Sequence, residues 1–245
     1  MSIGIIIQAR MGSERLPNKV LMDLSGKPVL KHIVDRVKQS KNVNKIIIAT
    51  TINPKDDAVV DFCKLEKLNY YRGSEENVLE RFLNAAKVFE IDTIIRITGD
   101  CPLIDPMIID EMIDKYLIIK PDILTNAGLD LSKRTYPRGL DTEVFSFSSL
   151  KFAHENAKHK YHFEHVTPFI YEQSKLVQYF QNDTNYSHVR ITLDTIEDFN
   201  LINYIYSKLY NSKHDFYLNE ILDLINQEPG ILDFNKNIEQ KNYKI

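Results

Sequence analysis

Runs of apolar residues alternate with amphipathic segments through the first half of the chain. Residues 3–7, 45–49 and 93–97 are short, nearly continuous apolar runs, typical of strands buried on both faces of a sheet. The segments between them, at 28–40, 56–67 and 75–89, carry apolar residues at helical spacing. Prolines that follow a capping side chain, at 53–54 and 105–106, mark further helix starts. The alternation predicts an α/β domain whose mostly parallel sheet is covered by helices on both faces.

The alternation breaks between about residue 126 and residue 181. Turn-forming runs at 126–128 and 136–139 and a group of histidines between 154 and 165 interrupt it. The pattern then resumes with an apolar run at 189–193, interpreted as a strand, and a helical segment at 196–210. We therefore expect one domain over residues 1–245 with a smaller lobe, about 126–181, inserted in it. The polar stretch after Gly230 is expected to be a docked or frayed tail.

Composition narrows the class of protein. The 31 basic and 34 acidic residues give a net charge of -3, which argues against a general nucleic-acid coat but permits a local basic pocket. Two cysteines are too few for a disulfide framework or a Cys-rich zinc site. No signal peptide is expected, because the apolar run at residues 3–7 is too short for one, and no apolar stretch approaches the roughly 20 residues that span a bilayer. We expect a cytoplasmic protein with neither a nucleic acid nor a membrane as partner.

A cluster of cations follows the first expected strand directly. Arg10, Arg15 and Lys19 stand close together with Gly12 and Ser13, although neither a Walker A motif nor a dinucleotide-binding glycine motif is present. Ligands of open α/β sheets bind beyond the carboxyl ends of the strands. A nucleoside triphosphate carries about four negative charges, which three cations and a divalent metal would offset. The loop favours a triphosphate site over a solvated basic turn.

The phrase Arg-Ile-Thr-X-Asp occurs twice, ending at Asp100 and at Asp194. Each copy ends an expected strand, where an aspartate commonly caps the following helix. Here Asp105 and the pair Thr195 and Asp198 already supply the caps. The two aspartates are therefore spare carboxylates at one edge of the sheet. Two carboxylates beside a triphosphate suit Mg²⁺, which keeps several waters, so the pattern favours a metal site over a structural role.

Two segments of the expected lobe carry candidate contacts to a second substrate. Arg138 beside a glycine suits an anionic group, and Asp141 and Glu143 suit hydroxyls, although a surface turn explains them equally well. His162 and His165 share a helix face. A zinc site is not expected there, because no matching Cys or His pair occurs elsewhere. Contact with the second substrate or a satisfied role in the fold both stay open for these histidines.

The segment from Ile5 to Leu21 resembles the cytidylyltransferase family, in particular the spore-coat polysaccharide branch, whose relatives are the CMP-ulosonate synthetases. The resemblance continues in order through residues 72–74, 98–105, 139–145, 164–168 and 192–198. Glu14 and Asn18 depart from the family, where many members carry Thr and Gly. The resemblance implies a Rossmann-like, mostly parallel sheet of the nucleotide-diphospho-sugar transferase type.

The resemblance also implies an activity: transfer of CMP from CTP to an anionic sugar or sugar- or polyol-phosphate acceptor, releasing pyrophosphate, for surface polysaccharide or glycan synthesis. Lys19, Arg15 and Arg10 would be catalytic, Asp100 and Asp194 would bind Mg²⁺, and the lobe would form a homodimer. The residues expected to hold CTP are Ala9, Arg10, Met11, Gly12, Ser13, Arg15, Lys19, Arg72, Gly73, Ser74, Thr98 and Asp100. Those expected to contact the acceptor are Arg138, Asp141, Glu143 and His165. The alternatives are a nucleotidyltransferase for UTP or GTP and a non-catalytic nucleotide-binding subunit.

Overall fold

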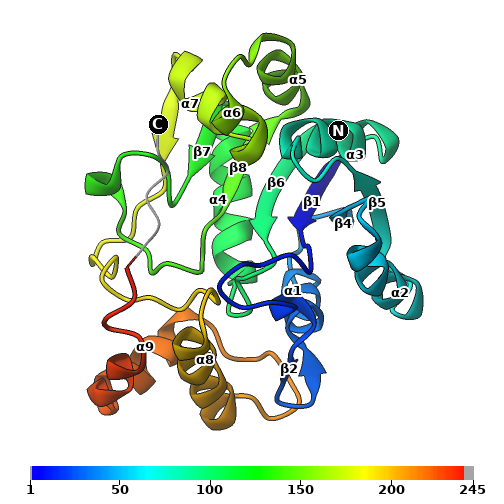
Figure 1. Ribbon diagram of the computed structural model, residues 1–245. Coiled ribbons are helices and arrows are strands. Elements are labelled where there is room, and N and C mark those ends of the chain that lie inside the picture. Colours follow the sequence, from blue (N-terminus) through cyan, green and yellow to red (C-terminus); the bar gives the residue numbers. More distant parts are fainter. Residues whose placement is uncertain (1, 240–245) are drawn as a thin grey trace.

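A seven-stranded sheet forms the centre of the computed structural model, which describes residues 2–239 (Figure 1). The strand order is β5-β4-β1-β6-β8-β7-β9, in which β5, β4, β1 and β6 run parallel, β8 is antiparallel to both its neighbours and β9 is parallel to β7. The predicted α/β class with a mostly parallel sheet is confirmed. The strands are β1 (Ile3–Gln8), β4 (Lys45–Thr51), β5 (Asn69–Gly73), β6 (Thr93–Thr98), β7 (Ile123–Thr125), β8 (Glu143–Ser146) and β9 (Val177–Tyr179), with a separate hairpin of β2 (Asp23–Leu24) and β3 (Lys27–Pro28).

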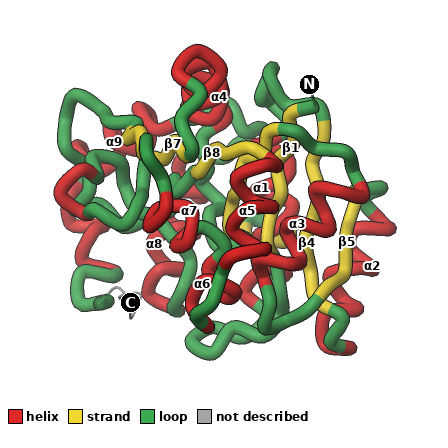
Figure 2. Tube along the Cα trace, turned by 90° about the horizontal axis from the view of Figure 1, so that it is seen from above, coloured by secondary structure: helices red, strands yellow, loops and turns green. Residues whose placement is uncertain are grey.

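Helices cover both faces of the sheet, and Figure 2 shows the strands as a band flanked by helices. Alternate residues of β1 supply the two cores, because successive side chains of a strand point to opposite faces: Ile5 and Ile7 pack in one core and Ile6 in the other. The first core is covered by α1 (Val29–Val37), α2 (Asp57–Leu65), α4 (Pro106–Ile119), α8 (Ile196–Leu209) and α9 (Leu218–Gln227). The second is covered by α3 (Val78–Val88), α5 (Phe147–Asn156), α6 (Lys160–His165) and α7 (Pro168–Gln173).

The apolar run at 189–193 does not form the strand that its pattern predicts. Its backbone meets the sheet region through a single bridge between Arg190 and Arg138, and Leu193 N donates to Asp100 O at 2.8 Å. The place beside β6 is filled by β8 instead. An apolar run predicts a buried, extended segment, and residues 189–193 are buried and extended. The run does not predict which strand, if any, forms backbone hydrogen bonds with the segment.

The ends of β1 and β6 lie side by side, which fixes where the loops after them begin. Gln8 pairs with Thr98 in the parallel register, and Gly99 N donates to Gln8 O at 2.8 Å. A Cβ atom at Gly99 would lie 2.9 Å from that carbonyl oxygen, so the close approach requires glycine. The loop that begins at Ala9 and the turn that carries Asp100 therefore start from one point.

Residues 126–181 contribute strands β8 and β9 to the central sheet and helices α5 to α7 to its second face. The role of this segment as an acceptor and dimerisation lobe stays a prediction. The described residues also form four short 3₁₀ helices, at Lys19–Leu21, Pro54–Asp56, Leu131–Lys133 and Pro229–Phe234. Across residues 2–239, no helix combines the length and the apolar character needed to cross a membrane.

Candidate functional site

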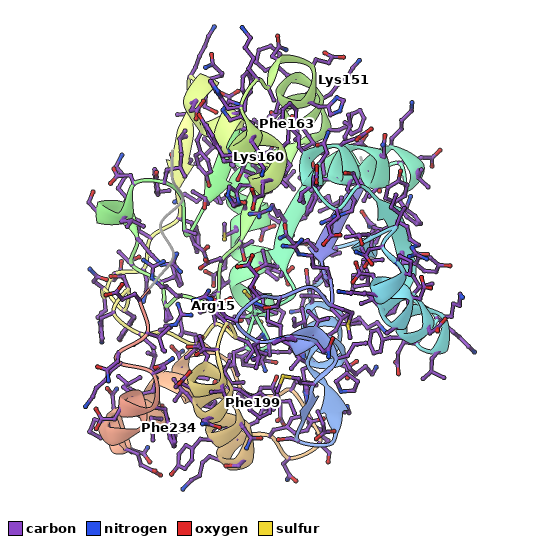
Figure 3. The ribbon with its side chains drawn as sticks, viewed as in Figure 1. Arg15, Lys151, Lys160, Phe163, Phe199 and Phe234 are labelled. Atoms are coloured by element: carbon purple, nitrogen blue, oxygen red, sulfur yellow. The ribbon has the colours of Figure 1, made fainter. Side chains whose placement is uncertain are left out.

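A cleft of about 300 Å³ opens at the carboxyl ends of β1 and β6. The loop after β1, the turn after β6, helix α6 and the segment before α8 all contribute to its walls. In Figure 3, Arg15 of the first loop lies between the labelled side chains of α6 and that of Phe199 in α8. The lining residues are Gln8, Ala9, Arg10, Gly12, Ser13, Glu14, Arg15, Lys19, Val20, Thr98, Gly99, Asp100, Glu164 and Asp194.

Lys19 joins the two aspartates of the repeated phrase. Its Nζ donates to Asp100 Oδ2 at 3.0 Å, to Asp194 Oδ1 at 2.9 Å and to Leu193 O at 2.8 Å. The preceding residue, Asn18, has φ 61° and turns the chain into this position. Asparagine tolerates that left-handed conformation better than most residues, so the turn does not require a glycine.

Burial and charge oppose each other in this cluster, and charge prevails. Burial would lower the pKa of the Lys19 amine, but the charges of Asp100 and Asp194 outweigh it and raise that pKa. Burial would likewise raise the pKa of Asp100, but Lys19 and a hydrogen bond from Thr98 lower it. The lysine is therefore a cation and the aspartate an anion at neutral pH.

Asp194 is held from its other oxygen by two arginines. Its Oδ2 lies 3.0 Å from Arg15 and 3.0 Å from Arg190. Arg190 also binds both oxygens of the fully buried Asp198, which in turn accepts from Asp194 N at 2.9 Å. Analysis of the sequence missed Arg190 as a site residue, although the first position of the repeated phrase was the signal that could have found it.

Charges of both signs line the cleft. Arg10, Arg15 and Lys19 are the three cations, and Glu14, Asp100, Glu164 and Asp194 are four carboxylates. Arg10 lies 3.1 Å from a further carboxylate, Glu75, another partner that the sequence analysis did not identify. A triphosphate would meet almost balanced charge here, so its binding calls for an additional cation.

The two central aspartates fit a divalent cation of the magnesium type. One carboxylate oxygen of Asp100 and one of Asp194 converge on a single point, marked by Lys19 Nζ. No group of three or more His, Cys, Asp or Glu side chains within residues 2–239 is arranged to hold a metal. A pair of carboxylates suits Mg²⁺, which retains waters and takes phosphate oxygens, better than it suits a closed zinc site.

Four residues expected to hold CTP lie outside the residues that line the cleft: Met11, Arg72, Gly73 and Ser74. The Arg72 guanidinium donates to the carbonyls of Thr51 and Asn53 and pairs with Asp57 at 2.7 Å. Met11 N donates to Asp56 at 2.6 Å, and Ser74 O accepts from Arg81 at 2.6 Å. These contacts brace the loops around the cleft, and a role for the four residues beside the nucleoside stays a prediction.

The expected acceptor residues do not line the cleft either. Glu143 is buried, pairs with Arg96 at 2.6 Å and accepts from the hydroxyls of Thr167 and Tyr171. Arg96 also donates to Gln8, a lining residue, at 3.1 Å. Glu143 therefore connects α7 and the preceding turn to the floor of the cleft.

The other acceptor candidates flank this connection. Asp141 pairs with Arg134, and the backbone of Arg138 bonds to both Val189 and Ile191. Burial lowers the pKa of His165, which directly follows the lining residue Glu164. Contact of these side chains with an acceptor stays a prediction.

His162 has a satisfied role in the fold. The ring is buried, one nitrogen lies 2.9 Å from Glu172, and the other accepts from the backbone of residues 158 and 159. This is one of the two possibilities left open by the sequence.

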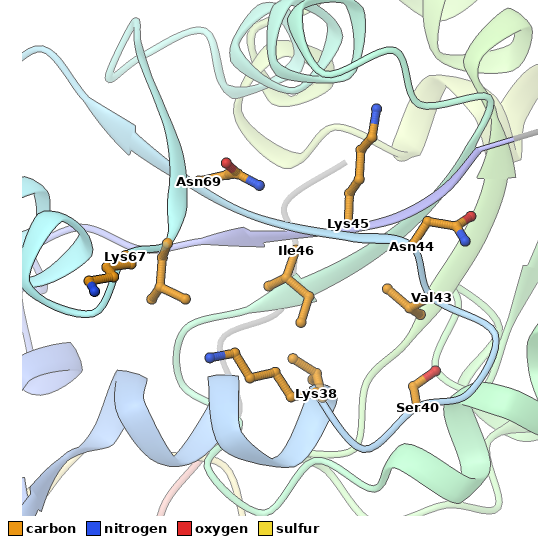
Figure 4. A pocket seen from close by; sticks show the side chains of 10 residues that line it. Lys38, Ser40, Val43, Asn44, Lys45, Ile46, Lys67 and Asn69 are labelled. Atoms are coloured by element: carbon orange, nitrogen blue, oxygen red, sulfur yellow. The ribbon is translucent and has the colours of Figure 1, made fainter.

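A second hollow, of about 310 Å³, lies at the amino ends of β4 and β5 (Figure 4). Three lysines line it, and each lies near the carboxyl end of a helix. Lys38 follows α1, Lys67 follows α2, and the Lys45 amine donates to Phe89 O, just beyond α3, at 2.6 Å. Cations stabilise the negative ends of helices. The lysines of this hollow thus have a structural explanation that needs no ligand.

Comparison with known proteins identifies relatives along the whole chain. A family model described as cytidylyltransferase matches residues 4–244. The chain is 33% identical to the spore coat polysaccharide biosynthesis protein SpsF of Bacillus subtilis, with 93% of this chain and 95% of that protein covered. It is 36% identical to a 3-deoxy-manno-octulosonate cytidylyltransferase of Haemophilus influenzae, over 46% of this chain and 45% of that one. The structure of a cytidylyltransferase from Leptospira borgpetersenii superposes with a TM-score of 0.88 at 33% identity and covers 99% of this chain and 100% of that one.

Proposed function

The chain belongs to the cytidylyltransferase family, and on that premise we propose that it transfers CMP from CTP to an anionic sugar or sugar- or polyol-phosphate acceptor and releases pyrophosphate. The observation that carries the proposal is the convergence of Asp100 and Asp194 on Lys19 in a cleft lined by two further cations, Arg10 and Arg15. This arrangement supplies both a carboxylate pair for Mg²⁺ and cations for the phosphates.

The reaction that we propose is in-line attack of an acceptor oxygen on the α-phosphorus of CTP. Lys19 and Arg15 stabilise the negative charge on the phosphates as the bond to pyrophosphate breaks, and Arg10 helps to bind the triphosphate. Asp100 and Asp194 would hold Mg²⁺, which would supply positive charge to offset that of the phosphates. A phosphate acceptor attacks as an anion without a general base, whereas a hydroxyl acceptor must give up its proton to one.

The acceptor class and the pathway are supported by the relatives. The Bacillus protein is named for spore coat polysaccharide biosynthesis, and the Haemophilus enzyme for 3-deoxy-manno-octulosonate, an acidic sugar. We propose an acceptor of that general kind and a role in surface polysaccharide or glycan synthesis. Arg138 and His165 are the residues that we propose to meet its anionic group.

Two measurements test this function. Mass action predicts that CTP with Mg²⁺ raises the melting temperature more than UTP, GTP or ATP does, because a ligand that binds only the folded state stabilises it. Pyrophosphate release from CTP on addition of 3-deoxy-manno-octulosonate or a sugar phosphate tests turnover. Stronger stabilisation by UTP, GTP or ATP would mean that the enzyme is specific for another base. Nucleotide binding without pyrophosphate release in the presence of any acceptor would favour a regulatory subunit.

Removal of either central carboxylate tests the metal site. We expect Asp100→Asn and Asp194→Asn to lower Mg²⁺-dependent turnover by about 100-fold or more, because each removes a proposed metal ligand from the cleft. Steady-state pyrophosphate release over a Mg²⁺ titration measures the effect. Asp61→Asn, at an exposed position of α2, is the matched control and keeps wild-type turnover. Wild-type activity in both cleft variants would remove the metal assignment.

We propose further that the enzyme is a cytoplasmic homodimer. The resemblance supports the dimer, and residues 126–181 expose apolar side chains such as Leu131, Phe152 and Leu176 that a partner chain would cover. Small-angle scattering should give twice the mass of one chain, and a single-chain mass would contradict the dimer.

A further inference from the structure

All donors of Lys19 are engaged inside the protein. An ammonium group has three N–H bonds, and the side chain makes three hydrogen bonds, to Asp100, Asp194 and the Leu193 carbonyl. Its side chain is only 12% exposed, against 24% for Asp100 and 15% for Asp194. A phosphate can therefore bind Lys19 only after at least one of these bonds breaks.

The bonds at stake include the two that a divalent cation would replace. The carboxylate oxygens nearest to Lys19 Nζ, at 3.0 Å and 2.9 Å, are those that converge on a single point in the cleft. An ammonium and a divalent cation repel one another strongly at such short range, so both cannot be bound by this pair of oxygens together. The second oxygen of Asp194 already lies against Arg15 and Arg190 and offers no easy alternative.

We propose that Lys19 is an internal counter-ion that competes with the divalent cation for Asp100 and Asp194, so that the cation binds together with the nucleotide rather than before it. The inference rests on the proposed magnesium-dependent transfer. A triphosphate gives Lys19 new anionic partners, and the divalent cation gives both carboxylates a new cation. When nucleotide and metal bind together, Lys19 exchanges the carboxylates for phosphates and every charge in the cleft keeps a partner. When the metal binds alone, it displaces Lys19 from the carboxylates and supplies no new anion for the buried ammonium group.

The competition predicts a gain of metal affinity when the lysine charge is removed. Mn²⁺ serves as the probe, and its free concentration is read by electron paramagnetic resonance in a titration of the full chain without nucleotide. We expect Lys19→Met to bind Mn²⁺ about tenfold more tightly than wild type, a typical size for coupling between two sites. Lys27→Met is the matched control, because Lys27 pairs with Asp35 outside the cleft, and it should leave the affinity unchanged.

A second pair of variants locates the effect. Lys19→Gln is also neutral and keeps a hydrogen-bonding group, so it should show the same gain if Lys19→Met does not fold. Adding Asp100→Asn to either variant should abolish the gain, because it removes one of the two carboxylates. Circular dichroism of each variant verifies the fold.

Two outcomes would overturn the inference. Equal Mn²⁺ affinity in wild type and in the folded Lys19 variants would mean that the lysine is a structural brace and no competitor. Absence of Mn²⁺ binding in those variants would mean that the carboxylates are not a metal site. Pyrophosphate release from CTP by the wild-type protein is measured separately. Because turnover does not require Lys19 to compete with the metal, this assay distinguishes either failure from a failure of the proposed function.

Discussion

Val166 adopts a backbone conformation that branched L-residues rarely take. Its φ is 71° and its ψ is -57°, and Thr167 N donates across it to His165 O at 2.8 Å. This geometry is a γ-turn of the uncommon, strained form. Such a conformation costs about 1–3 kcal/mol and persists where the surroundings over-determine it.

The surroundings of Val166 do hold it on both sides. Its own side chain is fully buried, and the Thr167 hydroxyl donates to the buried Glu143 at 3.0 Å. On the other side, Glu164 lines the cleft. The turn therefore sets the position of Glu164 and His165 relative to the sheet.

Replacement of Val166 by alanine and by glycine separates packing from strain. Both changes remove buried methyl groups, but only glycine removes the strain of a positive φ. We expect the free energy of unfolding of Val166→Gly to be larger than that of Val166→Ala by about 1 kcal/mol or more. At most positions the alanine variant is the more stable of the two. Urea denaturation of the two variants measures the difference.

The usual order of the same two residues can be measured at Lys151, an exposed position inside α5. There the alanine variant should be the more stable by about 1 kcal/mol, because glycine loses more backbone freedom in a helix. If alanine were also the more stable at position 166, the turn would store no strain.

At the scale of elements, two buried histidines join α1 to the segment between α8 and α9. His32 Nδ1 lies 2.9 Å from His214 Nε2, and His32 Nε2 lies 2.6 Å from the Leu24 carbonyl. A carbonyl only accepts, so His32 Nε2 donates to it. Burial lowers the pKa of His32 and favours its neutral form, in which Nδ1 carries no proton and accepts from His214 Nε2.

This pair makes stability depend on pH. Burial, followed by the charge of Arg36, lowers the pKa of His214 to about 4, and burial lowers the pKa of His32. Below pH 6.5 the unfolded chain takes up protons that the folded chain refuses, so stability falls as pH drops toward about 4. Between pH 7 and pH 5 we expect His214 alone to cost about 2 kcal/mol of unfolding free energy, measured by urea denaturation at each pH.

His214→Gln keeps a donor for His32 but cannot titrate. Between pH 7 and pH 5 it should lose about 2 kcal/mol less than wild type. Equal losses in the two proteins would mean that His214 is not held neutral.

The elements that the sequence predicted are those whose signals are local. Buried runs such as residues 3–7 and 93–97 and the Asp105 cap depend on neighbouring residues alone, and all three are present. The antiparallel placement of β8 and the loss of a strand at 189–193 depend on which backbones pair across the fold. No local pattern encodes that choice, because the same extended, buried segment satisfies either arrangement.

At the scale of the whole molecule, the same division explains the candidate site. Strand ends gather at one edge of a parallel sheet, so the approach of Lys19 and Asp100 followed from their positions after β1 and β6. Asp194 follows a segment that is not a strand, and it reaches the site where Leu193 N donates to Asp100 O. The pairing of Arg10 with Glu75 and of Arg96 with Glu143 joins loops or strands distant in sequence. Such partners become visible only once the topology brings them together.

The C-terminal segment contacts residues that support the candidate site. The tail after Gly230 docks, as one of the two expectations had it: Asn235 is buried and donates to Arg190 O at 3.0 Å and to Asp198 Oδ1 at 2.8 Å. Burial would raise the pKa of Asp198, but the hydrogen bonds from Arg190, and after them the one from Asn235, lower it. The expected tail also includes residues 240–245, which lie outside the described part of the chain.

Asn235 therefore offers a test of whether the C-terminal segment supports the site from a distance. Asn235→Ala leaves the Arg190 carbonyl without this donor and Asp198 with one hydrogen bond fewer, so we expect the free energy of unfolding to fall by about 1–3 kcal/mol. Asn237→Ala, two residues further along and exposed, should change it by less than about 0.5 kcal/mol. Urea denaturation of both compares them directly. Because Asp198 also binds the backbone of Asp194, only Asn235→Ala should weaken the stabilisation by CTP and Mg²⁺, and equal effects of the two variants would show that the tail merely covers the surface.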